Sequence, residues 1–182
     1  MNFAGLILKA FGWSVDITVP DFPKCIICVA PHTSNWDFVL GKLAYAAVGR
    51  HAGFLMKDTW FFFPMGLLFK ALGGIPVPRR RKQDGRSLTS EVVERFQKAT
   101  RMAVAITPEG TRSRTSQWRT GFLTIAREAH VPVVLGVIDF ATKNIFIRDE
   151  FVPTGNTEAD MRAIKRYYIP YQGMYPEKFT AE

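Results

Sequence analysis

The sequence predicts an α/β fold, a single domain in which a mostly parallel sheet is flanked by helices. Three observations support this prediction. The chain has 182 residues, a length that suits one domain with a substantial core. Hydrophobic residues make up 47% of the chain and charged residues 22%, which is typical of a globular protein. Short apolar runs alternate along the chain with segments at helical spacing, as in a layered α/β domain.

In the first half of the chain, a buried strand is expected at residues 24–30, where the apolar run CIICVA lies. A polar loop follows and leads to a helix at about residues 35–48, and then to a second strand at residues 53–56. Residues 60–72 are very apolar, but 13 residues are too few to cross a bilayer in the usual way. Pro64 and Gly66 also interrupt this segment.

In the second half, the clearest helical pattern is at residues 87–100, where Leu88, Val92, Phe96 and Ala99 fall on one face. The last helix is expected to start near Thr157. Its Asp160 would complete a variant of the capping box, and Met161, Ile164 and Tyr167 would form its inner face. The remaining expected elements are an extended piece at residues 75–77, strands at 102–107 and 133–138, a helix at 121–129 and a hairpin partner at 145–147.

The N-terminal segment, residues 1–20, is expected to precede the main domain at residues 21–182. Its short apolar run is interrupted by Lys9, so it is too short to span a bilayer. It also lacks a basic leader and an obvious cleavage site. The segment could lie on a surface as an amphipathic helix, or it could pack against the domain.

The formal net charge of the chain is +8, which favours an acidic partner: nucleic acid, an anionic membrane or a phosphorylated small molecule. Residues 79–119 contain 11 Lys and Arg against 4 Asp and Glu, so this segment holds almost all of the excess. Aromatic residues do not alternate with these cations as they do in single-strand binders, and no DNA-reading motif is present. We therefore expect no nucleic-acid partner.

Two cysteines, Cys25 and Cys28, have the spacing C-x-x-C, which also occurs in metal and redox sites. Both lie within the predicted strand at residues 24–30, and side chains three apart on a strand point to opposite faces. The chain has no second cysteine pair to complete a zinc site. We expect buried free thiols, a reducing compartment and no bound metal.

The strongest candidate for chemistry is the segment PHTSNWD, which contains His32 and Asp37 and lies between the first buried strand and a helix. Ligand sites in α/β folds cluster at the carboxyl ends of strands. If the carboxylate of Asp37 meets the imidazole of His32, it fixes the tautomer and leaves the other ring nitrogen as a base. Alternatively, His32 makes only a local hydrogen bond and Asp37 stabilises the helix N-terminus.

Two further segments carry residues suited to binding an anion. The motif PEGTRS follows the predicted strand at residues 102–107 and contains Glu109, Gly110, Thr111 and Arg112. Its glycine permits a tight turn, and its arginine offers a planar fork that matches phosphate. The motif GGIPVPR ends at Arg79 and opens the basic segment, while Lys57 is one more cation before residues 60–72. Each segment alone could equally be an ordinary polar turn on the surface.

Taken together and in this order, these segments resemble the PlsC-type 1-acylglycerol-3-phosphate acyltransferases of the glycerolipid acyltransferase superfamily. HTSNWD matches the H-x-x-x-x-D block of that family, and GGIPVPR resembles its second block. PEGTRS is close to the third block, and Val131-Pro132-Val133 resembles the fourth. The resemblance covers roughly residues 25–138, which is most of the chain.

The resemblance implies that His32 is the general base and that Asp37 orients it. Glu109 and Gly110 would then shape the acceptor pocket. Arg79 and Arg112, with Lys57, would hold the phosphate of the acceptor, and the hydroxyl of Thr111 could add a donor. Members of the family use acyl-CoA or acyl-carrier protein as donor, need no metal or other cofactor, and act at a membrane. The resemblance therefore implies a peripheral enzyme on the cytoplasmic face of the membrane that acylates a lysophospholipid.

Some positions depart from the family pattern. Family members often have an acidic residue where this chain has Pro78 and a phenylalanine where it has Thr107, and Leu135 stands near the place of a second proline in the fourth block. These differences leave the base chemistry intact and the acceptor open. A lyso-aminolipid acceptor, or a non-catalytic relative that binds anionic lipid, is the alternative. Residues 60–72 could dip into the membrane, line an acyl tunnel or pack in the core.

Overall fold

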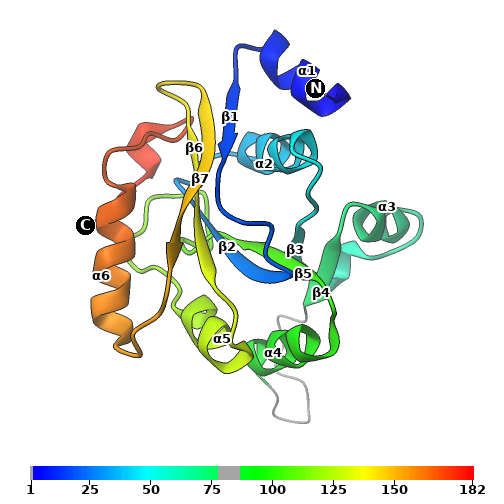
Figure 1. Ribbon diagram of the computed structural model, residues 1–182, viewed down its shortest axis with the longest axis vertical. Coiled ribbons are helices and arrows are strands. Elements are labelled where there is room, and N and C mark those ends of the chain that lie inside the picture. Colours follow the sequence, from blue (N-terminus) through cyan, green and yellow to red (C-terminus); the bar gives the residue numbers. More distant parts are fainter. Residues whose placement is uncertain (1, 78–86) are drawn as a thin grey trace.

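The computed structural model of the chain describes residues 2–77 and 87–182 (Figure 1). One seven-stranded sheet runs through it in the order β1-β7-β6-β2-β5-β3-β4. All neighbouring strands are parallel except β6 and β7, so the predicted α/β fold with a mostly parallel sheet is confirmed. The strands are β1 (Ser14–Ile17), β2 (Lys24–Ala30), β3 (Gly53–Lys57), β4 (Gly74–Val77), β5 (Met102–Ile106), β6 (Val133–Asp139) and β7 (Asn144–Phe151).

Helices cover both faces of the sheet (Figure 1). Side chains from α4, α5 and α6 pack on one face, and side chains from α1 and α2 pack on the other. The described helices are α1 (Phe3–Ala10), α2 (Trp36–Ala47), α3 (Met65–Ala71), α4 (Leu88–Lys98), α5 (Gly121–Ala129) and α6 (Thr157–Tyr168), with short 3₁₀ turns at Asp58–Trp60 and Pro176–Lys178.

The central strand β2 shows how the two layers form. Ile26 and Cys28 pack with the α4, α5 and α6 side chains, whereas Cys25 and Ile27 pack in a separate cluster on the other face. The prediction that the two cysteines face opposite sides and are buried and free is therefore confirmed. Burial raises the pKa of Cys25 to about 11 and raises that of Cys28 further. Both sulfurs are thus protonated core side chains at neutral pH.

The N-terminal residues supply one helix and one strand. Asn2 caps α1, because its side chain accepts a hydrogen bond from the N–H of Gly5 at 3.1 Å. Leu8 of this helix is buried, while Phe3 and Leu6 are exposed. The following strand β1 pairs in parallel with β7 at the edge of the sheet.

The apolar residues 60–72 are not core residues. They run from the end of the 3₁₀ turn Asp58–Trp60 through α3, which lies beyond β4 at the outer edge of the sheet (Figure 1). Trp60 is 54% exposed and Phe63 is 82% exposed, and Leu67 and Leu68 are exposed as well. Of the three alternatives for this segment, packing in the core is therefore wrong, since most of its large apolar side chains are exposed. None of the helices described is long and apolar enough to cross a membrane.

Three local predictions differ from the structure. Leu88 is 42% exposed, because α4 begins at this residue and its core face starts at Val92. The N-cap of α6 is Asn156, whose side chain accepts from the N–H of Ala159, and the carboxylate of Asp160 binds Thr154. Met161 and Ile164 are buried as predicted, but the buried aromatic residue of α6 is Tyr168, which follows Ile164 by four positions, and Tyr167 is only partly buried.

The sheet topology determines where the candidate site lies, at the carboxyl ends of β2 and β5. β2 lies between β6 and β5 and is parallel to both, so the loops after β2 and β5 leave the same edge side by side. The loop after β2 leads to α2 on one face, and the chain after β5 leads to α5 on the other face. Connections that leave adjacent strands toward opposite faces open a crevice between them, where ligands commonly bind in α/β folds.

Candidate functional site

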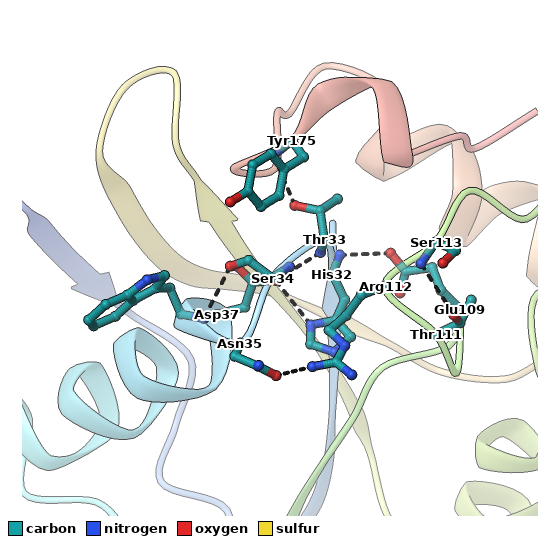
Figure 2. Close-up of polar contacts among 11 residues, drawn as sticks. His32, Thr33, Ser34, Asn35, Asp37, Glu109, Thr111, Arg112, Ser113 and Tyr175 are labelled. Carbon is teal, nitrogen blue, oxygen red and sulfur yellow. Dashed lines mark hydrogen bonds and ion pairs between the residues drawn. The ribbon is translucent and has the colours of Figure 1, made fainter.

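The loop after β2 brings His32 and Asp37 together (Figure 2). The Nδ1 atom of His32 lies 3.0 Å from Oδ2 of Asp37. The backbone N–H groups of Thr33 and Ser34 each donate to the same oxygen at 2.9 Å. The hydroxyl of Ser34 donates to the other carboxylate oxygen at 3.0 Å. The predicted meeting of carboxylate and imidazole is therefore observed.

This network fixes the orientation of the imidazole. The side chain of Asp37 is 2% exposed, and its four contacts leave it little freedom to rotate. Because Nδ1 faces the carboxylate, that nitrogen carries the proton and Nε2 remains as the basic atom. The His32 side chain is 18% exposed and lines a cavity, so a substrate can approach it. Geometrically, the pair can remove a proton from a bound hydroxyl.

Glu109 comes from the neighbouring strand end, but it lies behind the His32 loop. Its Oε1 accepts the backbone N–H of His32 at 2.8 Å, and the residue is buried. Its other oxygen, Oε2, is buried and has no hydrogen-bond partner among the described residues. Burial raises the pKa of Glu109 to about 7, against the opposite effect of backbone N–H groups including that of His32. The described cavity lining does not include this residue.

The turn after Glu109 presents its neighbours to the cavity. Gly110 has a φ of +62°, which favours glycine, and its N–H donates to the carbonyl of Thr107. Gly110, Thr111 and Arg112 all line the cavity. The guanidinium of Arg112 donates to the side-chain oxygen of Asn35 and so links this turn to the His32 loop (Figure 2).

The cavity has a volume of about 940 Å³ and runs from His32 along α2 and the sheet. Much of its wall is apolar, with Val29, Phe38 and Tyr45 among the lining residues. Pockets of this size and character take small molecules or long apolar groups. Its charged lining side chains are His32, Asp37, Lys42, Lys57, Arg112 and Arg119.

Four of these charged side chains are cations. The exposed Lys57 and Arg119 line the cavity together with Arg112, as suits a ligand with a phosphate. Lys42 differs, because its ammonium donates to the carbonyls of Ala52 and Leu72 at 2.9 and 2.8 Å. Burial lowers the pKa of this lysine.

The predicted phosphate ligand Arg79 lies outside the residues that the structure describes. Among the described residues, no cluster of three or more His, Cys, Asp or Glu side chains is arranged to hold a metal ion.

An attack on a carbonyl group produces an oxyanion, which backbone N–H groups of the His32 loop or near Gly110 could bind if they were free. The N–H groups of His32, Thr33 and Ser34 already donate to the carboxylates of Glu109 and Asp37. The N–H of Gly110 donates to the carbonyl of Thr107. As arranged, these four groups therefore hold the site together and do not point at a substrate.

Comparison with known proteins decides the family. The family model described as "Acyltransferase" matches residues 19–138, which include both strand ends of the site. The chain belongs to the acyltransferase family. This confirms the family resemblance that the sequence motifs indicated.

Two relatives of this acyltransferase-family chain are informative. The 1-acyl-sn-glycerol-3-phosphate acyltransferase epsilon of Mus musculus is 29% identical over 115 residues, which cover 61% of this chain and 30% of that relative. The chain thus spans less than a third of the length of this relative. The crystal structure of the 1-acyl-sn-glycerophosphate (LPA) acyltransferase PlsC from Thermotoga maritima aligns with a TM-score of 0.59 and 19% identity. That alignment covers 91% of this chain and 75% of the other, and it confirms the fold.

Sequence reasoning did not identify several residues of the site. Ser34 could have been found, because Ser-x-x-Asp before a helix is a capping-box pattern. The structure shows half of that box: the N–H of Ser34 donates to the Asp37 carboxylate, but the Ser34 hydroxyl also donates to it and accepts from the N–H of Trp36. Arg119 stood within the basic segment but had no motif of its own. Gly173 and Tyr175 contact Thr33 from more than 100 residues away, and no local pattern signals such a contact.

Proposed function

We propose that the chain is an O-acyltransferase that moves a fatty acyl group from acyl-CoA or acyl-carrier protein to the hydroxyl of a lysophospholipid. The proposed acceptor is 1-acylglycerol-3-phosphate, which gives phosphatidic acid. The observation that carries the proposal is the His32–Asp37 contact in the wall of a large, mainly apolar cavity. Family membership and the curated relative support the same chemistry.

In the proposed reaction, Nε2 of His32 removes the proton from the acceptor hydroxyl as its oxygen attacks the thioester carbonyl. The new C–O bond forms, the C–S bond breaks, and the imidazolium returns the proton to the leaving thiolate. Asp37 stabilises the imidazolium between these two steps. Such base catalysis is typically worth about 100- to 10,000-fold in rate. The thioester supplies the driving force, so the step needs no metal or other cofactor.

The surroundings of the pair suit both substrates. Lys57, Arg112 and Arg119 on the cavity wall supply positive charge for the acceptor phosphate. The apolar wall along α2 suits a fatty acyl chain, which would be removed from water there. In this scheme Glu109 holds the His32 loop from behind, since its carboxyl group accepts the His32 N–H and is buried.

We also propose that the protein acts peripherally at the cytoplasmic face of the membrane. The exposed apolar side chains of residues 60–72 support this, because large apolar residues in contact with water favour transfer to a lipid surface. Trp60 belongs to this segment and also lines the cavity, so a membrane-bound segment would hold the cavity next to the lipid acceptor. The net charge of +8 favours anionic lipids.

The test offers purified protein a panel of lysolipids with labelled acyl-CoA and labelled acyl-carrier protein, and identifies each acylated product by mass spectrometry. The expected result is phosphatidic acid, with one thiol released per ester formed. Acylation of phosphate-free lysolipids alone would overturn the proposed acceptor and keep the chemistry. Binding to anionic vesicles without consumption of any thioester would overturn the enzyme and favour a lipid-binding relative.

A further inference from the structure

The chain after α6 runs back to the site and contacts the His32 loop. We call residues 172–175 the C-terminal strap. It is tied to the end of β6, because the N–H of Gln172 donates to the buried carboxylate of Asp139 at 3.1 Å and the N–H of Phe140 donates to the carbonyl of Gln172 at 2.9 Å. The strap lies beyond residues 19–138, the part of the chain that the family model matches.

Thr33 is the contact point between the strap and the loop. The N–H of Tyr175 donates to Oγ1 of Thr33 at 3.2 Å, and Thr33 is 2% exposed. Figure 2 shows the Thr33 side chain pointing toward Tyr175, while the His32 ring points the other way. The strap therefore supports the loop from the side opposite the catalytic ring.

Gly173 fits against Thr33 only because it has no side chain. A Cβ atom at position 173 would lie 2.5 Å from Oγ1 and 2.7 Å from Cγ2 of Thr33, against 3.4 Å or more for ordinary contact. An alanine there must displace Thr33 or the strap by several tenths of an ångström. The Thr33 side chain is buried, and the Thr33 backbone N–H donates to the same Asp37 oxygen that binds Nδ1 of His32, so a shift of the Thr33 backbone reaches the His32–Asp37 pair.

We infer that Gly173 is a positioning residue: the strap sets the place of Thr33, and Thr33 sets the orientation of the Asp37 carboxylate toward His32. The inference rests on the proposed function for its catalytic consequence, but not for its geometry. Catalysis of this kind is sensitive to such shifts, since a misplacement of about 1 Å can cost roughly 100-fold in rate.

The test is a double-mutant cycle of Gly173→Ala and Thr33→Ala, with Met174→Ala as the control within the strap. Gly173→Ala is expected to lower kcat by about 10- to 100-fold with both KM values little changed. Thr33→Ala loses the Tyr175 hydrogen bond and is expected to lower kcat only several-fold. The double variant should return close to the level of Thr33→Ala, because the two nearest clashing atoms are gone and the remaining 3.2 Å contact with the Thr33 Cβ needs a shift of only a few tenths of an ångström. If Gly173→Ala acted only by destabilising the whole protein, the losses of kcat in the two single variants would instead add in the double variant.

A second readout does not depend on turnover. In protein with ¹⁵N-labelled histidine, the Nδ1–H proton of His32 should give a signal that Gly173→Ala shifts or abolishes and that the double variant restores. If the wild type transfers no acyl group, the proposed function fails while this signal still tests the strap. If Gly173→Ala does not fold, Thr33→Val keeps the side-chain shape, removes the acceptor and should lower kcat and shift the signal. An unchanged kcat and signal in the folded variants would overturn the inference.

Discussion

Replacing Glu109 by glutamine should change how the stability of the protein depends on pH. Burial raises the pKa of Glu109 from 4.5 to about 7, so the folded protein holds this proton more tightly than the unfolded chain does. The corresponding stabilisation is fully present below pH 4.5 and is lost as the pH rises through 7. A pKa difference of this size changes the free energy of unfolding by about 3 kcal/mol. Glutamine at this position accepts the His32 N–H in the same way but does not titrate.

The assay is urea unfolding of wild type and Glu109→Gln at a series of pH values from 4.5 to 8, followed by circular dichroism. The free energy of unfolding of the variant minus that of the wild type should rise by about 3 kcal/mol across this range. Glu150→Gln, which alters an exposed side chain on β7, is the control and should stay within about 0.5 kcal/mol of wild type. A difference for Glu109→Gln that stays flat with pH would refute the reasoning that this carboxyl group is buried without adequate partners.

Three further variants test other parts of the account. Asp37→Asn keeps the shape of the side chain but removes its charge. The kcat of this variant should fall by about 1,000- to 10,000-fold while the protein remains folded. A small loss of kcat would mean that His32 needs no carboxylate. Arg112→Gln should raise the KM of a phosphate-bearing acceptor by about 10- to 100-fold, which the control Arg114→Gln should not do. Phe63→Asp should weaken co-sedimentation with anionic vesicles by about 10-fold or more. The control is Val152→Asp, which changes another exposed apolar residue. An equal loss in both variants would mean that the added negative charge, and not the lost apolar side chain, weakens binding.

The central elements of the fold could be predicted because their sequence patterns are strong. The apolar run of β2 follows Lys24 and stops at Pro31, and α5 begins and ends as its amphipathic pattern indicates. β1 could not be predicted, since its four residues are partly exposed and are defined by pairing with β7, which lies about 130 positions later. Long-range pairing of this kind leaves little trace in a short local sequence.

The candidate site was predictable where its residues are close in sequence. His32 and Asp37 are five residues apart, so a loop between a strand and a helix was enough to suggest their contact. The position of Glu109 was not predictable, because its motif marks a turn but does not tell which side of the turn faces the cavity. The contact between Gly173 and Thr33 depends on how the C-terminal segment packs, and only the folded chain shows it.

The measurement that tests the central claim most directly is the initial rate of thiol release from acyl-CoA in the presence of 1-acylglycerol-3-phosphate, for wild type and His32→Ala. The control is His51→Ala, which removes an exposed histidine outside the described cavity lining. We predict that His32→Ala lowers the rate by at least about 100-fold with folding intact, and that His51→Ala does not. Wild-type turnover in a folded His32→Ala variant would contradict the proposed role of His32 as the base.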